Sequence, residues 1–175
     1  NPCKCGGGAG PFACRKGPAC QANYFSRISG PFLDRIDLFV DVAPVTATDL
    51  TLPPPSEGTA DAAARVAIAR ERQLERFGDE VGNRRAVNAD APSSSVDAIC
   101  ALDANARALV AKAAEQLSLS ARAYHRILKV ARTIADLDGA ESVARIHAAE
   151  ALTYRFRPAM LPLSGRSGAV SGLIA

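Results

Sequence analysis

An acid and an arginine stand side by side after a turn in the first quarter of the chain. A Gly-Pro turn at residues 30–31 leads to Asp34 and Arg35, and then to an alternating apolar run from Ile36 to Val42. Arginine is always protonated and carries a rigid fork of donors that suits a phosphate oxygen. The segment therefore predicts a charge placed to bind a phosphate, with a structural surface pair between Asp34 and Arg35 as the alternative.

Four cysteines form the second group of residues with a possible chemistry. They fall within the first twenty residues, beside a glycine-rich run: Cys3, Cys5, Cys14 and Cys20. Four thiolates in a flexible loop can form a tetrahedral Zn²⁺ site. The first pair is spaced more tightly than a usual zinc knuckle and the second pair more widely. Disulfides and uncoordinated thiols are the alternatives, and disulfides are disfavoured in a reducing cytoplasm.

The parts that bind nucleotide phosphates and Mg²⁺ are missing from the sequence. A phosphate-binding loop of the type Gly-x-x-x-x-Gly-Lys-Ser/Thr needs a Gly-Lys dipeptide, and the chain contains none. No apolar strand ends in paired acids that could hold Mg²⁺. The chain, which begins without methionine, therefore carries no nucleotide-phosphate or Mg²⁺ site of these two types.

The composition favours helices and a cytoplasmic protein. The 175 residues suffice for one or two small domains, and 48% of them are hydrophobic. Aromatic residues make up only 5% and alanine is abundant, which favours helix-on-helix packing through small side chains. The net charge of +3 is too small to indicate a partner. No run is long enough to span a membrane and no signal peptide is visible.

Hydrophobic periodicity predicts where the regular structure lies. The alternation from Ile36 to Val42 predicts a strand with one apolar face. Asp103, Ser120 and Ser142 are expected to cap helices, and Gly139 to stop one. Cys100 lies in an apolar helical pattern and is expected to be a core thiol. The predicted helices span residues 21–28, 59–77, 93–100, 103 to about 117, 120–139 and 142 to about 154.

A proline run divides this pattern into domains. Three consecutive prolines between Leu52 and Gly58 form a stiff, extended linker. The predicted fold is mainly α: a C-terminal helical bundle preceded by a remnant of an α/β core with one or two strands. The expected parts are the end of the core over 1–51, the linker over 52–58, the helical domain over 59–157 and a loosely ordered tail over 158–175.

Three stretches together resemble the magnesium-chelatase-like AAA+ ATPases, and in particular the ComM (YifB) type, the competence or Mg chelatase-related proteins. They are Asn1-Pro-Cys, residues 26–38 and residues 119–137, and the resemblance covers roughly residues 1–157. It implies that the helical domain is the lid behind the nucleotide site of an AAA+ ATPase. It also implies that ATP and Mg²⁺ bind mainly to a preceding part of the protein. Since the phosphate loop of such an ATPase is missing here, we expect this chain to be the C-terminal fragment of a longer protein.

The resemblance implies roles at the subunit boundary. Asn1 matches the sensor asparagine that orients the attacking water, and a chain end without a role is the alternative. Arg35 matches the arginine finger, which reaches across the boundary to the neighbour's ATP. Asp34 would aim its guanidinium. An arginine finger has no substrate in its own subunit, so it implies a ring, in this family a homo-hexamer.

Further roles are implied inside the subunit. Arg122 matches the second sensor, which contacts the γ-phosphate and couples the lid angle to the nucleotide state. An exposed helix arginine is the alternative for Arg122, and Arg126, one turn further on, is the second candidate for the role. His125 between them is expected to pack rather than to catalyse. The family shows a similar cysteine cluster, which supports possible Zn²⁺ binding by the four cysteines.

Three functions are consistent with these residues. In the first, the parent protein is a hexameric ATPase acting on DNA, with branch migration or helicase activity in natural transformation. In the second, it is the ATPase subunit that drives Mg²⁺ insertion into a porphyrin. In the third, the chain alone is a zinc-bearing helical binding module. No basic stripe with interleaved aromatic residues locates DNA on this chain, and no membrane partner is expected.

The missing phosphate loop generates the first prediction. The purified 175-residue chain should show no ATP hydrolysis and little affinity for nucleotide, because it has no loop to hold the phosphates. A coupled phosphate-release assay and a fluorescent-nucleotide titration measure the two quantities. Turnover by the pure chain would contradict the reading as a fragment of an ATPase.

Overall fold

The structure is a computed structural model, and it describes residues 5, 14, 16, 18–40, 42, 45–54, 56–78 and 87–155. The predicted helix over 21–28 lies slightly earlier, as α1, and a further helical turn, α2, follows it. The predicted helix over 59–77 has the expected bounds as α3. In chain order the helices are α1 (Pro18–Phe25), α2 (Gly30–Leu33), η2 (Asp49–Thr51), α3 (Thr59–Phe77), η3 (Asn88–Asp90), α4 (Val96–Cys100), α5 (Ala104–Leu117), α6 (Ala121–Leu137) and α7 (Arg145–Arg155).

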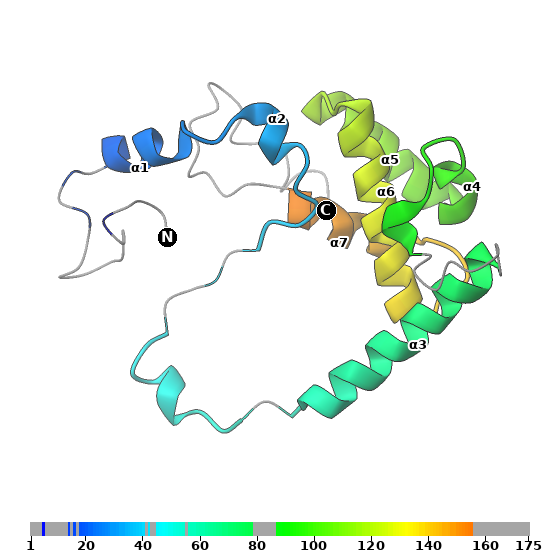
Figure 1. The fold of residues 1–175 in the computed structure, drawn as a ribbon, viewed down its shortest axis with the longest axis horizontal. Helices are drawn as coiled ribbons and strands as arrows, with labels where there is room; N and C mark the ends of the chain where they lie inside the picture. Colours follow the sequence, from blue (N-terminus) through cyan, green and yellow to red (C-terminus); the bar gives the residue numbers. More distant parts are fainter. Residues whose placement is uncertain are drawn as a thin grey trace.

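Helix α6 lies at the centre of the bundle. It packs against α3, α4, η3 and α7, and α7 packs in turn against α5. Figure 1 shows α4 to α7 gathered together, with α3 along one edge of the group and α1 standing apart from it. Small and aliphatic side chains fill the core, among them Val96, Val110, Leu128, Ala131 and Leu152. The prediction of a mainly α fold is confirmed.

Most helix ends lie where local signals predict them. Asp103 caps α5, because its carboxylate accepts the N–H of Ala106 at 2.6 Å. Ser120 caps α6 in the same way, with the N–H of Ala123 at 3.1 Å. The chain leaves α6 through Gly139, whose φ of +78° is left-handed and is adopted by glycine without strain.

The start of α7 differs from the prediction. Ser142 does not cap it, because the helix begins three residues later. Val143 is held in a parallel β-bridge with Leu102, so the backbone there is extended rather than helical. The helix is capped from within its own first turn, where Nδ1 of His147 accepts the N–H of Ala144 at 3.0 Å.

The strand predicted over residues 36–42 does not form in this chain. Its described residues have no regular secondary structure, and the bridge between Leu102 and Val143 is the β-pairing found in the described part of the structure. Leu38 and Val40 are 50% and 66% exposed. A β-strand needs a neighbouring strand that pairs with its backbone along its length, and the described residues provide no such strand. The sequence alternates apolar and other residues as a strand does, but the described structure has no sheet in which this strand could pair.

A buried carboxylate joins α3, η3 and α6. Asp136 on α6 accepts an Nε–H of Arg132 at 3.0 Å, an N–H of Arg76 at 3.0 Å and an amide N–H of Asn88 at 2.8 Å. Arg76 makes a second, bidentate contact to the same carboxylate. Arg132 also donates to the backbone carbonyls of residues 140 and 141. The carboxylate thus holds three elements and a loop at one point, which we call the Asp136 network.

The Asp136 network keeps a charge in the interior. Arg132 and Asp136 are each 1% exposed. Burial alone would raise the pKa of Asp136, but hydrogen bonds from Arg76 and Asn88 and the nearby guanidinium charges outweigh it and hold the pKa below its ordinary value. Burial also lowers the pKa of Arg132, and the negative charge of Asp136 offsets only part of this shift. The carboxylate therefore stays ionised at neutral pH.

Several predicted features lie outside the described residues: Asn1, Cys3 and the tail over 158–175. The proposed division at the linker over 52–58 stays a prediction. Among the helices that the structure describes, none combines the length and apolar content needed to cross a lipid bilayer.

The Asp136 network generates the second prediction. Asp136→Asn should lower the free energy of unfolding by about 3–5 kcal/mol, because it leaves buried guanidinium groups without their anion. Urea unfolding followed by circular dichroism measures the loss. The matched control is Asp90→Asn, which changes an exposed aspartate on η3 and should cost less than about 0.5 kcal/mol.

The same pair of variants tests the pH dependence. The folded-state pKa of Asp136 lies below 3.8, its ordinary value, so the stabilisation is complete above that pH and is lost as the pH falls through the folded-state pKa. The stability difference between wild type and Asp136→Asn should therefore shrink over the acidic range below about pH 4. A difference that is constant over this range would contradict the role given to the ionised carboxylate.

Candidate functional site

The segment that carries Arg35 is fastened to the bundle by its acids. We call residues 30–40 the arm. Asp34 accepts a hydrogen bond from the Ser120 hydroxyl at 2.9 Å and forms an ion pair with Arg155 at 2.6 Å. The expectation that Asp34 aims the guanidinium of Arg35 by direct contact is therefore wrong in this chain. The Arg35 guanidinium is exposed and donates to the carbonyl of Pro31 at 2.9 Å.

A second set of contacts fastens the residues that follow Arg35 in the chain. Asp37 forms an ion pair with Arg126 on α6. Arg155 donates to the carbonyl of Ile36 at 2.5 Å, and the backbone N–H of Phe39 donates to the carbonyl of Tyr154 at 2.9 Å. The arm thus runs over the start of α6 and the end of α7.

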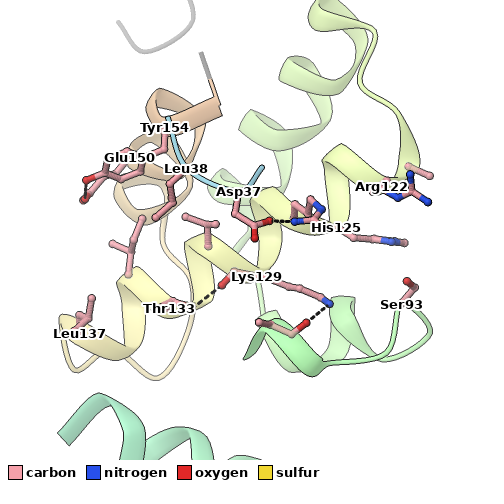
Figure 2. A pocket seen from close by; sticks show the side chains of 15 residues that line it. Asp37, Leu38, Ser93, Arg122, His125, Lys129, Thr133, Leu137, Glu150 and Tyr154 are labelled. Atoms are coloured by element: carbon pink, nitrogen blue, oxygen red, sulfur yellow. Dashed lines mark hydrogen bonds and ion pairs between the residues drawn. The ribbon is translucent and has the colours of Figure 1, made fainter. Parts of the chain in front are cut away.

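A groove of about 820 Å³ opens along α6, beside the arm. Basic side chains line it at helical spacing, since Arg122, His125, Arg126 and Lys129 lie on neighbouring turns of one face. Figure 2 shows Arg122 and His125 at one end of the groove and Leu137 at the other. Its apolar lining comes from Leu38, Val130, Ile134, Leu137 and Tyr154.

The cations of the groove differ in what already holds them. Arg126 is paired with Asp37, and Lys129 donates to the carbonyl of Ala89 at 2.8 Å. Arg122 is exposed in the first turn of α6. The N-terminal end of a helix carries a partial positive charge, so an anion at this end of the groove would meet both that charge and the Arg122 guanidinium.

The structure brings the two candidate arginines to the same helix end by different routes. Arg122 belongs to α6, whereas Arg35 belongs to the arm that Ser120 and Arg126 tie to α6. Arg35 is not among the residues that line the groove. His125 lines the groove and lies edge-on to the ring of Tyr124, with 5.8 Å between the ring centres.

Three of the four N-terminal cysteines are described, and they lie together. The sulfur atoms of Cys5, Cys14 and Cys20 are all within 4.8 Å of one another, and those of Cys5 and Cys20 are 3.8 Å apart. Tetrahedral Zn²⁺ with Zn–S bonds of about 2.3 Å requires sulfur atoms roughly 3.8 Å apart. The observed spacing therefore fits a zinc site with three described ligands.

Cys100, the fifth cysteine of the chain, lies in a different environment from these three. Cys100 is buried in α4, and its thiol donates to the carbonyl of Leu128 at 3.3 Å. Burial raises the pKa of this thiol to about 12, which removes it from thiolate chemistry at neutral pH. The prediction of a core thiol is confirmed.

Sequence reasoning missed the residues that hold the site together. Arg155 fastens the arm, yet nothing in its sequence neighbourhood distinguishes it from a surface arginine at a helix end. The Asp136 network is visible in the sequence in part, because Arg132 and Asp136 stand four residues apart beside the apolar stripe of α6. A charged pair next to a core stripe indicates a buried ion pair.

Comparison with known proteins gives the family. Residues 56–155 match the family of the magnesium chelatase subunit ChlI, C-terminal, and residues 1–50 match the magnesium chelatase, subunit ChlI family. Competence protein ComM of Haemophilus influenzae is 40% identical over 142 residues, which are 81% of this chain and 26% of that protein. The uncharacterised protein YifB of Escherichia coli is 36% identical over 147 residues, covering 79% of this chain and 26% of that protein.

A more distant relative covers more of the chain. An uncharacterised protein of Mycobacterium tuberculosis is 32% identical over 155 residues, which are 89% of this chain and 30% of that protein. The chain thus spans about a quarter of the length of the ComM and YifB relatives that it matches. Both family matches and the identity to these two relatives agree with the resemblance carried by residues 26–38 and 119–137. The chain belongs to the magnesium chelatase-related ComM/YifB family and carries its C-terminal helical domain.

Proposed function

We propose that this chain is the C-terminal part of a ring-forming AAA+ ATPase, most simply a homo-hexamer. In this proposal Arg35 reaches the ATP of the neighbouring subunit, and Arg122 contacts the γ-phosphate of the ATP in its own subunit. The observation that carries the proposal is that both guanidinium groups are exposed while the acids around them are engaged elsewhere. Among the described residues neither Arg35 nor Arg122 forms an ion pair, and an arginine in this state can bind a phosphate from outside.

The chemistry of hydrolysis explains why two arginines are needed. The transition state of phosphoryl transfer spreads negative charge over the phosphate oxygens, and guanidinium groups on two sides stabilise that charge. Mg²⁺ and the phosphate loop belong to the rest of the protein in this proposal. Asn1 would orient the attacking water, as its match to the family implies.

The groove along α6 supports a nucleotide ligand. Its basic end suits phosphates, and its apolar end suits a flat base, so the two ends match the two ends of ATP. Arg122 lies at the basic end, where the start of α6 also favours an anion. Arg126 is the weaker candidate for a phosphate contact, because Asp37 already neutralises it.

DNA is the substrate that we propose for the assembled ATPase. The relative from Haemophilus influenzae is named a competence protein, which supports a role with DNA in natural transformation, such as branch migration or helicase activity. The family descriptions name magnesium chelatase, which favours the alternative of metal insertion into a porphyrin. Turnover of the full-length protein stimulated by DNA supports the first function, and turnover stimulated by a porphyrin acceptor supports the second.

The third prediction concerns Arg35. In the full-length protein Arg35→Ala should reduce hydrolysis by about 10³- to 10⁵-fold, since a finger supplied in trans contributes about that much to the rate. ATP affinity should change little, because the finger belongs to the neighbour's site. Steady-state turnover and a fluorescent-nucleotide titration measure the two effects.

Rings assembled from two kinds of variant subunit distinguish the roles of Arg35 and Arg122. Arg35→Ala subunits mixed with subunits whose phosphate loop is disabled should regain activity, because each supplies what the other lacks. Arg122→Ala subunits should not regain activity at their own sites when wild-type neighbours are added. If Arg35→Ala hydrolyses ATP at the wild-type rate, the finger assignment is overturned.

The fourth prediction concerns zinc. We propose that Cys3, Cys5, Cys14 and Cys20 hold one structural Zn²⁺, which would brace the glycine-rich N-terminal segment. Metal analysis of protein purified without chelator should find one zinc per chain. A thiol reagent should modify the four N-terminal cysteines only after the metal is removed, while Cys100 stays unmodified until the chain unfolds.

Two variants serve as controls for the metal site. Cys5→Ser should abolish stoichiometric zinc, because it removes one of the sulfur atoms in the cluster. Cys100→Ala should retain one zinc per chain, since its sulfur lies in the bundle core. Native protein that shows four reactive thiols and no metal would contradict the zinc proposal and leave the ATPase proposal untouched.

A further inference from the structure

We infer that Arg155 is a positioning residue for Arg35, acting through Asp34, and that it ties the arginine finger to the helical bundle. The inference rests on the proposed function, because it supplies a reason for the placement of a finger. It concerns Arg155, a residue for which neither the sequence nor the family resemblance predicts any role.

Arg155 makes a dense set of contacts to the arm. Its guanidinium pairs with the Asp34 carboxylate at 2.6 Å and donates to the carbonyls of Asp34 at 3.2 Å and Ile36 at 2.5 Å. Its side chain is only 10% exposed. These contacts therefore grip the backbone on both sides of Arg35, and their partial burial makes them stronger than an exposed pair.

Arg35 depends on this grip for its own position. Its guanidinium donates to the carbonyl of Pro31, which belongs to the same arm. The position of the Arg35 side chain is therefore set by the position of the arm. The acids on either side of Arg35 are held by different helices, Asp34 by Arg155 of α7 and Asp37 by Arg126 of α6. We call these two ion pairs the latch.

The latch connects two nucleotide sites through one chain. Ser120 and Arg126, which hold the arm, lie two residues before and four residues after Arg122 on the same helix end. A tilt of α6 in response to nucleotide at Arg122 would be passed to the arm, and so to Arg35 in the neighbour's site. The latch is thus the physical element by which one subunit's site can influence the next.

The test uses the full-length protein and three single variants. Arg155→Ala removes the grip, Arg155→Lys keeps the charge but loses the fork of donors, and Arg145→Ala changes an exposed arginine on the same helix as a control. Since a misplacement of about 1 Å can cost roughly 100-fold in rate, Arg155→Ala should lower kcat about 100-fold with KM for ATP nearly unchanged. Arg155→Lys should recover part of kcat, and Arg145→Ala should match wild type.

Hydrogen exchange measures the latch itself. The backbone N–H of Phe39 is protected by the carbonyl of Tyr154, next to Arg155. In Arg155→Ala this amide should exchange roughly 10- to 150-fold faster, the range that corresponds to losing hydrogen bonds to a charged group. Amides in the core of α6 should exchange at the wild-type rate. Unchanged exchange at Phe39 would overturn the inference.

Mixed rings distinguish positioning from folding. Arg155→Ala subunits should regain activity when mixed with phosphate-loop variants, because their own sites remain intact, but not when mixed with Arg35→Ala subunits. Failure to regain activity with phosphate-loop variants, where Arg35→Ala subunits succeed, would reduce Arg155 to a structural residue and overturn the inference. Normal turnover of Arg155→Ala alone would overturn only the inference, whereas normal turnover of Arg35→Ala would overturn the proposed function and the inference with it.

Discussion

The carboxylate of Asp136 is the constraint on which the bundle depends. It gathers donors from α3, η3 and α6, and its guanidinium partner Arg132 extends the contact to the loop before α7. Buried ion pairs often contribute little net stability, because their desolvation cost is large. Their value here is specificity. Val66 and Ile68 of α3 are 52% and 53% exposed, so apolar burial alone would not select one docking position for this helix.

Helix α6 contributes residues to the core, to the Asp136 network and to the groove. Ile127 and Leu128 enter the core, Arg132 and Asp136 form the buried network, and Arg122 stands at the groove. The amphipathic pattern permits this, because successive turns of one helix present different faces at fixed offsets. A consequence is that the groove cannot move independently of the core. A ligand that shifts α6 must shift the packed bundle as a body.

The local features of the fold could be predicted from sequence. Asp103 and Ser120 cap their helices as predicted, and Gly139 ends α6. Three predictions failed, and each depended on a distant partner. The strand over 36–42 has no neighbouring strand among the described residues, and the start of α7 is displaced by the bridge between Leu102 and Val143. Asp34 pairs with Arg155 rather than with its neighbour Arg35.

The sequence by itself determined the helical character of the chain, the ends of α5 and α6, and the family. These follow from signals within a few residues: a period of 3.6, a cap that accepts a hydrogen bond three residues on, and short characteristic stretches. Only the tertiary structure decided which charges meet. Asp136 and Arg76 are 60 residues apart in the chain, and Asp34 and Arg155 are 121 apart. No local pattern encodes such a pair, because its partners come within reach only after the helices have packed.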